Sequence, residues 1–239
     1  MEKSQVIIFQ HAEWEKPGRI ADALEDSGID YQILFVAQDK KPALPDLDSI
    51  SGLVLMGGPM GAQDFDKYPG LKAEGKYTKA AVGVGVPTLG VCLGHQILAT
   101  ALGAKLKSGG KTEMGFSPVE RESRDSFLPL GKEPVNVLHW HSDLVSCPEE
   151  GTILASTKGT RNQAFRYGPA LGLQFHLEVD HTLLEEWLST EIMIDGLKKS
   201  QVKQIRSDYD RFAPEIRPLA DTVFRGFAAR CVSFGRDRL

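Results

Sequence analysis

Short apolar runs alternate with amphipathic segments along most of the chain. The apolar runs are typical of buried strands and lie at residues 6–9, 31–36, 53–56, 88–91 and 170–173. The amphipathic segments have apolar positions at helical spacing and lie at residues 19–27, 71–82 and 95–102. Strands that alternate with helices predict an α/β fold, with a mostly parallel central sheet and helices on both of its faces.

The pattern changes in the second half of the chain. Shorter added strands with turns between them are predicted at residues 116–121, 135–139, 153–156 and 163–167. Thr182 and Glu185 fit a capping box, which predicts a helix from Thr182 through Leu188. Beyond Gly196, Lys and Arg residues are interspersed with apolar residues at helical spacing. This C-terminal helical extension is expected to pack on the domain with a solvated basic face; the alternative is a docking surface for a partner.

Cys92 occupies a position that is typical of a catalytic nucleophile. It follows an apolar strand and precedes a predicted helix, within the sequence Gly-Val-Cys-Leu-Gly-His-Gln at residues 90–96. A strand reverses this sharply into a helix only where small residues flank the turn, as Gly90 and Gly94 do here. At a helix N-terminus, peptide dipoles favour the reactive thiolate form of a cysteine. A buried core cysteine is the alternative, so the motif needs support from elsewhere in the chain.

His176 and Glu178 supply that support. They follow the apolar run at residues 170–173, in the sequence Gln-Phe-His-Leu-Glu. Residues two apart in an extended chain point to the same side, so the two side chains are expected to meet. The glutamate would then accept the Nδ1 proton of the imidazole and leave Nε2 to face a thiol.

A glycine-rich loop after the strand at residues 53–56 completes the candidate site. Acyl transfer passes through an oxyanion that needs two convergent backbone N–H donors. We expect one donor from Leu93, the residue after the nucleophile. Gly58 is the second candidate, because a glycine lets the backbone approach the substrate and Pro59 stiffens the turn. An ordinary strand-to-helix turn is the alternative interpretation of this loop.

These three segments together resemble the signature blocks of the class I (triad-type) glutamine amidotransferases, in the family's order. The resemblance covers roughly the first four-fifths of the chain. It implies a flavodoxin-like glutaminase fold for residues 1–190, followed by the extension at residues 191–239. It also implies that Cys92, His176 and Glu178 form a triad that hydrolyses the side-chain amide of glutamine through a γ-glutamyl thioester and releases ammonia.

The same resemblance implies the positions that bind glutamine. They correspond to Gln96, one helical turn after the nucleophile, and to the backbone of Ser142 and Asp143. Leu177 departs from the family, because many members have proline there; the change affects backbone stiffness and removes no catalytic group. The resemblance implies no cofactor.

Composition limits the remaining possibilities. The chain has 239 residues, of which 41% are hydrophobic and 25% are charged, as is ordinary for a globular protein. Its net charge of −4 argues against broad nucleic-acid binding. No apolar stretch approaches membrane-spanning length, and the apolar start is expected to be a first strand rather than a signal peptide. Three widely spaced cysteines, one of them in the candidate site, favour a reducing cytoplasm.

His139 and His141 raise the question of a metal site. We expect none, because the nearby sequence offers no Cys, His or carboxylate at ligand spacing. The two histidines are interpreted as loop and core residues.

The fate of the released ammonia separates the possible functions. The chain has no nucleotide-binding signature of a synthetase, so the first hypothesis is a free-standing glutaminase that serves a separate synthetase subunit, most similar to the glutaminase half of GMP synthase. The second is a hydrolase of γ-glutamyl peptides that uses the same triad. The third is an inactive binding module, which an intact triad disfavours. A homodimer is compatible with each of them.

Overall fold

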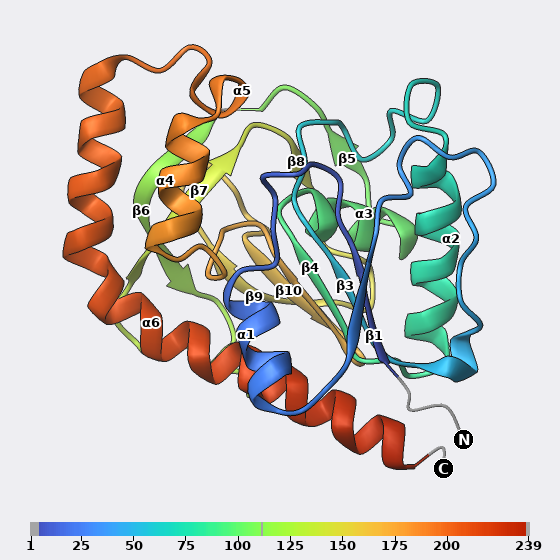
Figure 1. Ribbon diagram of the computed structural model, residues 1–239. Coiled ribbons are helices and arrows are strands. Elements are labelled where there is room, and N and C mark those ends of the chain that lie inside the picture. The colour runs from blue at the N-terminus through green and yellow to red at the C-terminus, as the bar shows by residue number, and fades with distance from the viewer. Residues whose placement is uncertain (1–4, 111, 238–239) are drawn as a thin grey trace.

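The computed structural model describes residues 5–110 and 112–237, and Figure 1 shows its architecture as a ribbon. In this part of the chain the strands are β1 (Gln5–Phe9), β2 (Tyr31–Leu34), β3 (Ile50–Leu55), β4 (Thr88–Val91), β5 (Leu106–Lys107), β6 (Glu113–Arg121), β7 (Val135–His141), β8 (Leu144–Val145), β9 (Thr152–Ser156), β10 (Ala164–Tyr167) and β11 (Ala170–Leu173). The helices are α1 (Arg19–Asp26), α2 (Gly70–Gly83), α3 (Leu93–Ala101), α4 (His181–Ser189), α5 (Glu191–Ile194) and α6 (Lys199–Arg236).

A single large sheet runs through the molecule. The described residues form a 9-stranded sheet in the order β2-β1-β3-β4-β11-β10-β9-β6-β7, with β5 and β8 paired separately. The strands from β2 to β11 are parallel to their neighbours, whereas β10, β9, β6 and β7 continue the sheet in antiparallel pairs. The predicted α/β fold, with a mostly parallel centre and smaller added strands, is therefore confirmed.

The two faces of the parallel strands are buried under different helices, as Figure 1 shows. On β1, Val6 and Ile8 pack in a core cluster with side chains of α1 and α6. Ile7 and Phe9 pack on the opposite face, in a cluster with side chains of α2 and α3. A strand that is buried on both faces is apolar at consecutive positions, which is why the sequence shows continuous apolar runs here.

The extension at the C-terminus is dominated by the 38-residue helix α6. Figure 1 shows it passing beside α4 and then bending to run beneath α1 and the sheet. Pro214 and Pro218 lie inside the helix, and each removes a backbone donor, which is a usual cause of such a bend. Phe224, Phe227 and Cys231 are buried in the same cluster as the strands. The predicted helical extension is confirmed, and one face of it completes the core.

Some predicted boundaries are corrected. The helix expected from Thr182 is α4, which begins at His181, and its N-cap is Asp180. The Asp180 side chain accepts a hydrogen bond from the backbone N–H of Leu183 at 2.7 Å, so the expected capping box at Thr182 is wrong. Asp180 performs the same physical task two residues earlier, because a carboxylate satisfies an unpaired N–H of the first helical turn. Within residues 5–110 and 112–237, every helix is too short or too polar to cross a membrane.

Candidate active site

Cys92 lies at the junction of β4 and α3. It is the N-cap residue of α3, with φ 51° and ψ −107°, and it alone has a positive φ among the described non-glycine residues. A Cβ atom on Gly90 would lie 2.5 Å from the carbonyl oxygen of Gly94, and one on Gly94 would overlap the carbonyl group of Leu55. Close backbone packing therefore requires both glycines, as the turn in the sequence predicted.

The Cys92 side chain faces a cavity of about 510 Å³. Its sulfur lies 3.7 Å from the backbone carbonyl oxygen of Trp140, to which the thiol donates a hydrogen bond. The cavity lining includes Cys92, Gly58, Gln96, Trp140 and Met193. The thiol therefore stands where a small substrate has room to bind.

His176 and Glu178 are both buried and directly paired. Nδ1 of His176 lies 2.6 Å from Oε1 of Glu178 and donates a hydrogen bond to this carboxylate oxygen. Burial on its own would lower the pKa of His176, but the Glu178 carboxylate and the neighbouring Cys92 thiol raise it well above its ordinary value. Nε2 is buried and has no hydrogen-bond partner among the described residues. The imidazole is thus held ready to exchange a proton through Nε2.

The rest of the fold fixes the orientation of this pair. The backbone N–H of His176 donates to the carbonyl oxygen of Leu138 at 2.9 Å. The indole ring of Trp187, from α4, stands edge to face against the imidazole, with ring centroids 4.9 Å apart. The Trp187 Nε1–H donates to the carbonyl oxygen of Trp14 at 2.7 Å. A ring held at its backbone, its edge and its face has little freedom to turn away from the thiol.

The two expected oxyanion donors lie next to each other. Gly58 follows β3, Leu93 opens α3, and both line the Cys92 cavity. A Cβ atom on Gly58 would lie 2.8 Å from the side chains of Leu93, His11 and Met60. The loop therefore approaches the start of α3 more closely than any other residue type permits.

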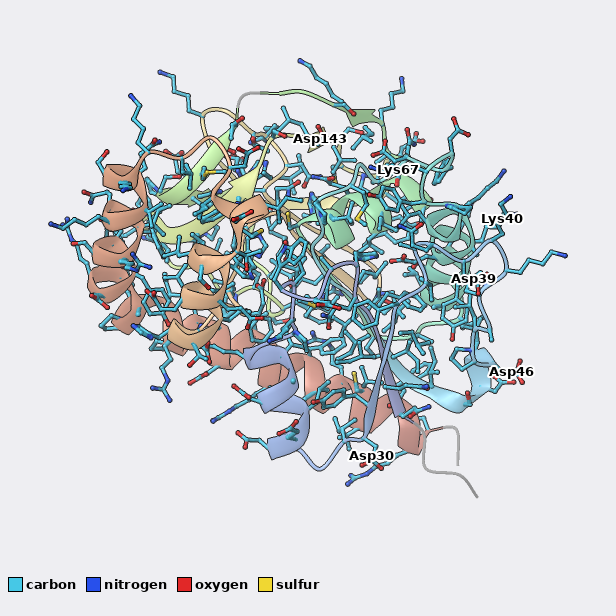
Figure 2. The ribbon with its side chains drawn as sticks, turned by 45° about the horizontal axis from the view of Figure 1, so that its top comes forward. Asp30, Asp39, Lys40, Asp46, Lys67 and Asp143 are labelled. Atoms are coloured by element: carbon cyan, nitrogen blue, oxygen red, sulfur yellow. The ribbon has the colours of Figure 1, made fainter. Side chains whose placement is uncertain are left out.

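The three residues expected to bind glutamine are also brought together. Nε2 of Gln96 donates to the carbonyl oxygen of Asp143 at 3.3 Å and to Oε1 of Gln174 at 3.0 Å. Oδ1 of Asp143 accepts a hydrogen bond from the backbone N–H of Gly109 at 2.9 Å. Ser142 and Asp143 line the cavity beside Gln96, and Figure 2 shows Asp143 at the upper rim of the molecule.

Three buried titratable residues, His11, Glu15 and Glu74, lie near the Gly58 loop. Glu15 lines the cavity and is 5% exposed, and burial raises the pKa of its carboxyl to about 7, against the effect of nearby His176. His11 and Glu74 form a fully buried ion pair at 3.0 Å. Glu74 had a detectable signal, because it shares a helical face with the buried residues Leu71, Thr78 and Ala81. His11 lies in an irregular loop and had none.

The prediction that His139 and His141 have no carboxylate nearby is wrong. Glu113 comes from β6, the antiparallel neighbour of β7, and its Oε2 lies 3.2 Å from Nε2 of His141. One potential ligand atom from each of the three residues lies within 4.8 Å of the others. Glu113 already accepts hydrogen bonds at 2.6 Å from side chains of Thr157, Thr160 and Gln163. The cluster therefore joins β6, the end of β7 and the segment at residues 157–163 by hydrogen bonds.

The cysteine turn and the buried His–Glu pair both lie at the carboxyl edge of the parallel strands, which is where the active sites of α/β sheets are found. The family model described as "Glutamine amidotransferase class-I" matches residues 18–194. The chain belongs to the class-I glutamine amidotransferase family.

Individual relatives agree with this assignment. The chain is 35% identical over 144 residues to one subunit of the glutamine-hydrolysing GMP synthase of Ignicoccus hospitalis, covering 58% of this chain and 72% of that protein. The corresponding subunit from Sulfolobus acidocaldarius is 33% identical over 155 residues, covering 63% of this chain and 78% of that protein. The crystal structure of a glutamine amidotransferase from Thermotoga maritima superposes with a TM-score of 0.84, at 30% identity, over 95% of this chain and 99% of that one.

Proposed function

We propose that the chain hydrolyses the side-chain amide of glutamine through a γ-glutamyl thioester on Cys92. The observation that carries the proposal is the buried His176–Glu178 pair, joined at 2.6 Å and placed beside a cysteine at a helix N-terminus. A hydrogen-bonded carboxylate fixes the tautomer and orientation of the imidazole, which then serves the thiol as base and the leaving group as acid.

The proposed reaction has two steps, and His176 transfers one proton in each of them. His176 Nε2 takes the proton of Cys92, and the thiolate attacks the amide carbon of glutamine. The C–N bond breaks as His176 returns the proton to the leaving nitrogen, which departs as ammonia. A water molecule then loses a proton to His176 and attacks the thioester. The C–S bond breaks, glutamate leaves, and His176 returns this proton to the sulfur, which restores the thiol.

The binding and oxyanion roles follow from the cavity. We assign the oxyanion to the backbone N–H groups of Gly58, in the loop after β3, and of Leu93, at the start of α3, both of which line the Cys92 cavity. Gln96, Ser142 and Asp143 line the same cavity, and we assign to Gln96 and to the backbone of the other two the binding of the amino-acid end of glutamine. The hydrogen bond from Gln96 to the Asp143 carbonyl supports this assignment, because it makes one rigid surface of the two elements.

We further propose that a separate synthetase subunit receives the ammonia. The similarity to proteins that are named as one subunit of a glutamine-hydrolysing GMP synthase supports a two-component arrangement. A cytoplasmic location fits the three cysteines, none of which is in a disulfide in the described part of the chain. We keep residues 1–190 as the amidotransferase unit and residues 191–239 as its extension.

Hydrolysis of γ-glutamyl peptides is the second candidate, and one observation favours it. Ile192 and Met193 of α5 line the same cavity as Cys92, although they lie beyond the proposed unit. Ile192 is 54% exposed. An apolar wall at the mouth of the site suits a leaving group larger than ammonia, because it offers contact area to an amine substituent.

The experiment that tests the proposal compares two products on the isolated chain. Ammonia release from glutamine is measured against amine release from γ-glutamyl dipeptides, with Cys92→Ser as the blank. A preference for glutamine in kcat/KM supports the glutaminase, and a preference for the dipeptides supports the second candidate. If the chain and its blank release neither product, it is an inactive binding module.

A further inference from the structure

The buried pair of His11 and Glu74 contacts the loop to which we assign the oxyanion. Nδ1 of His11 lies 3.0 Å from the carbonyl oxygen of Met56 and 3.1 Å from that of Gly57. Nε2 lies 3.0 Å from each carboxylate oxygen of Glu74, which comes from α2. The His11 and Glu74 side chains are both 0% exposed.

The partners of the ring determine its protonation. Carbonyl oxygens accept but never donate, so Nδ1 must carry a proton. Nε2 shares a proton with the carboxyl group of Glu74 in a second hydrogen bond. Burial opposes a charged ring, but the Glu74 charge and the Met56 and Gly57 carbonyl groups raise the pKa of His11 above its ordinary value. With or without the second proton, the Nδ1–H of His11 donates a hydrogen bond to the carbonyl oxygen of Gly57.

The carbonyl of Gly57 and the N–H of Gly58 belong to the same peptide group. That group is planar and trans, since the described chain has no cis peptide bond. In a trans peptide the C=O and N–H bonds point in opposite directions. Fixing the oxygen on the His11 side therefore directs the Gly58 N–H away from His11. Gly58 lines the Cys92 cavity, whereas His11 and Gly57 are not among its described lining residues.

We propose that His11, held by Glu74, is a positioning residue that orients the Gly58 N–H toward the oxyanion. Glycine makes this necessary, because a Gly-Gly peptide has no Cβ to restrict its rotation. The inference rests on the oxyanion role assigned to Gly58 above. His11 and Glu74 would hold this donor in place before the substrate binds, and an oxyanion site is effective because its donors are oriented in advance.

The test separates carbonyl chemistry from the reactivity of the thiol. Alkylation of Cys92 by iodoacetamide displaces iodide at a saturated carbon and forms no oxyanion, whereas turnover of glutamine forms one in each step. We expect His11→Leu to lower kcat/KM for glutamine about 10- to 100-fold and to change the alkylation rate less than about 2-fold. His11→Asn places an amide N–H near the position of Nδ1 and should recover most of the lost turnover.

Two further variants distinguish the positioning role of His11 from a general loss of folding. His11→Leu combined with Glu74→Leu leaves no unpaired buried carboxylate, so it serves if the single variant fails to fold. Thr78→Val changes a buried residue one turn along α2 from Glu74 and should behave as wild type. The inference is overturned if the folded leucine variants turn over glutamine normally, if turnover and alkylation fall together, or if His11→Asn recovers nothing. A wild-type chain that is alkylated at Cys92 but hydrolyses no glutamine or γ-glutamyl substrate instead refutes the proposed function.

Discussion

The guanidinium of Arg19 donates a hydrogen bond to the hydroxyl of Tyr209, 3.0 Å away, and so joins α1 to α6. The same guanidinium donates to the backbone carbonyl oxygens of Leu177 and Val179, the two neighbours of Glu178. The Arg19 backbone N–H donates to the carbonyl oxygen of Glu178 itself at 3.0 Å. One residue therefore connects the C-terminal helix to the backbone of the triad carboxylate.

Arg19→Met tests this connection. The variant keeps much of the side-chain volume but loses the hydrogen bonds to the triad segment, so we expect both a lower Tm and slower glutamine hydrolysis. A loss of about 2–4 kcal/mol fits the removal of several partly buried hydrogen bonds from a charged donor. Arg206→Met is the matched control, since Arg206 joins α6 to Glu185 at an exposed site and should cost less than about 1 kcal/mol. Equal effects of the two variants would contradict the role of Arg19.

The thiols should react selectively. Burial raises the pKa of Cys147 to about 11 and that of Cys231 to about 12, whereas Cys92 lines the cavity beside His176. We expect a glutamine-like electrophile at neutral pH to label Cys92 alone, as mapped by peptide mass spectrometry. Cys92→Ser should abolish both labelling and hydrolysis while keeping the Tm, because the volume is nearly unchanged. Preferential labelling of either other cysteine would refute the nucleophile assignment.

The members of the proposed triad should contribute unequally to the rate of glutamine hydrolysis. His176→Ala removes the group that carries the proton, whereas Glu178→Gln removes only its orientation and charge stabilisation. We expect Glu178→Gln to retain roughly 10- to 100-fold more activity than His176→Ala, measured as kcat for glutamine. An unchanged rate in Glu178→Gln would show that this carboxylate is not the third member, and Asp143 or His181 would be tested next.

The packing of the nucleophile turn should be intolerant of a single methyl group. In Gly94→Ala the new Cβ overlaps the Leu55 carbonyl group, so either α3 or β3 must move. We expect a loss of at least about 2 kcal/mol, with hydrolysis reduced more than stability explains, because Leu93 moves with the helix. Gly75→Ala is the control: it lies within α2 with nothing within 4 Å of the new Cβ, and it should stabilise the protein by about 0.5–1 kcal/mol.

Glu15 should make stability depend on pH. Its pKa in the folded protein is about 7, against an ordinary value of 4.5, so between these values the folded state holds a proton that the unfolded chain releases. Stability must therefore fall as the pH rises from 4.5 to 7 and then level off, with a loss of no more than about 3 kcal/mol. Glu15→Gln should remove this decline and raise the Tm at pH 8, whereas the exposed neighbour Glu13→Gln should leave it in place.

The parts of the site that the sequence predicted lie beside continuous apolar strands. Cys92 and the His176–Glu178 segment each follow a strand that is buried on both faces, and such strands are conspicuous in a sequence. The order of strands in a parallel sheet then brings their carboxyl ends together, which is why three distant segments predicted one site.

The parts of the site that could not be predicted from the sequence depend on contacts between distant side chains. The pairing of His11 with Glu74 joins residues 63 positions apart, and that of Glu113 with the β7 histidines depends on the register of two antiparallel strands. The extension was predicted as a helix from its spacing, but its depth of burial was not. Cys231 packs so closely on Gly52 of β3 that a Cβ atom there would overlap its sulfur. Nothing in either local sequence indicates that match.

The left-handed backbone of Cys92 makes stability and activity favour different residues at one position. A non-glycine residue in such a conformation costs about 1–3 kcal/mol, which glycine would relieve. Selection of this protein for heat resistance alone should therefore enrich glycine at position 92 and produce a more stable fold that lacks the nucleophile. Inactive descendants of such a scaffold are thermodynamically easy to reach, and retention of the cysteine is itself a sign that chemistry is under selection.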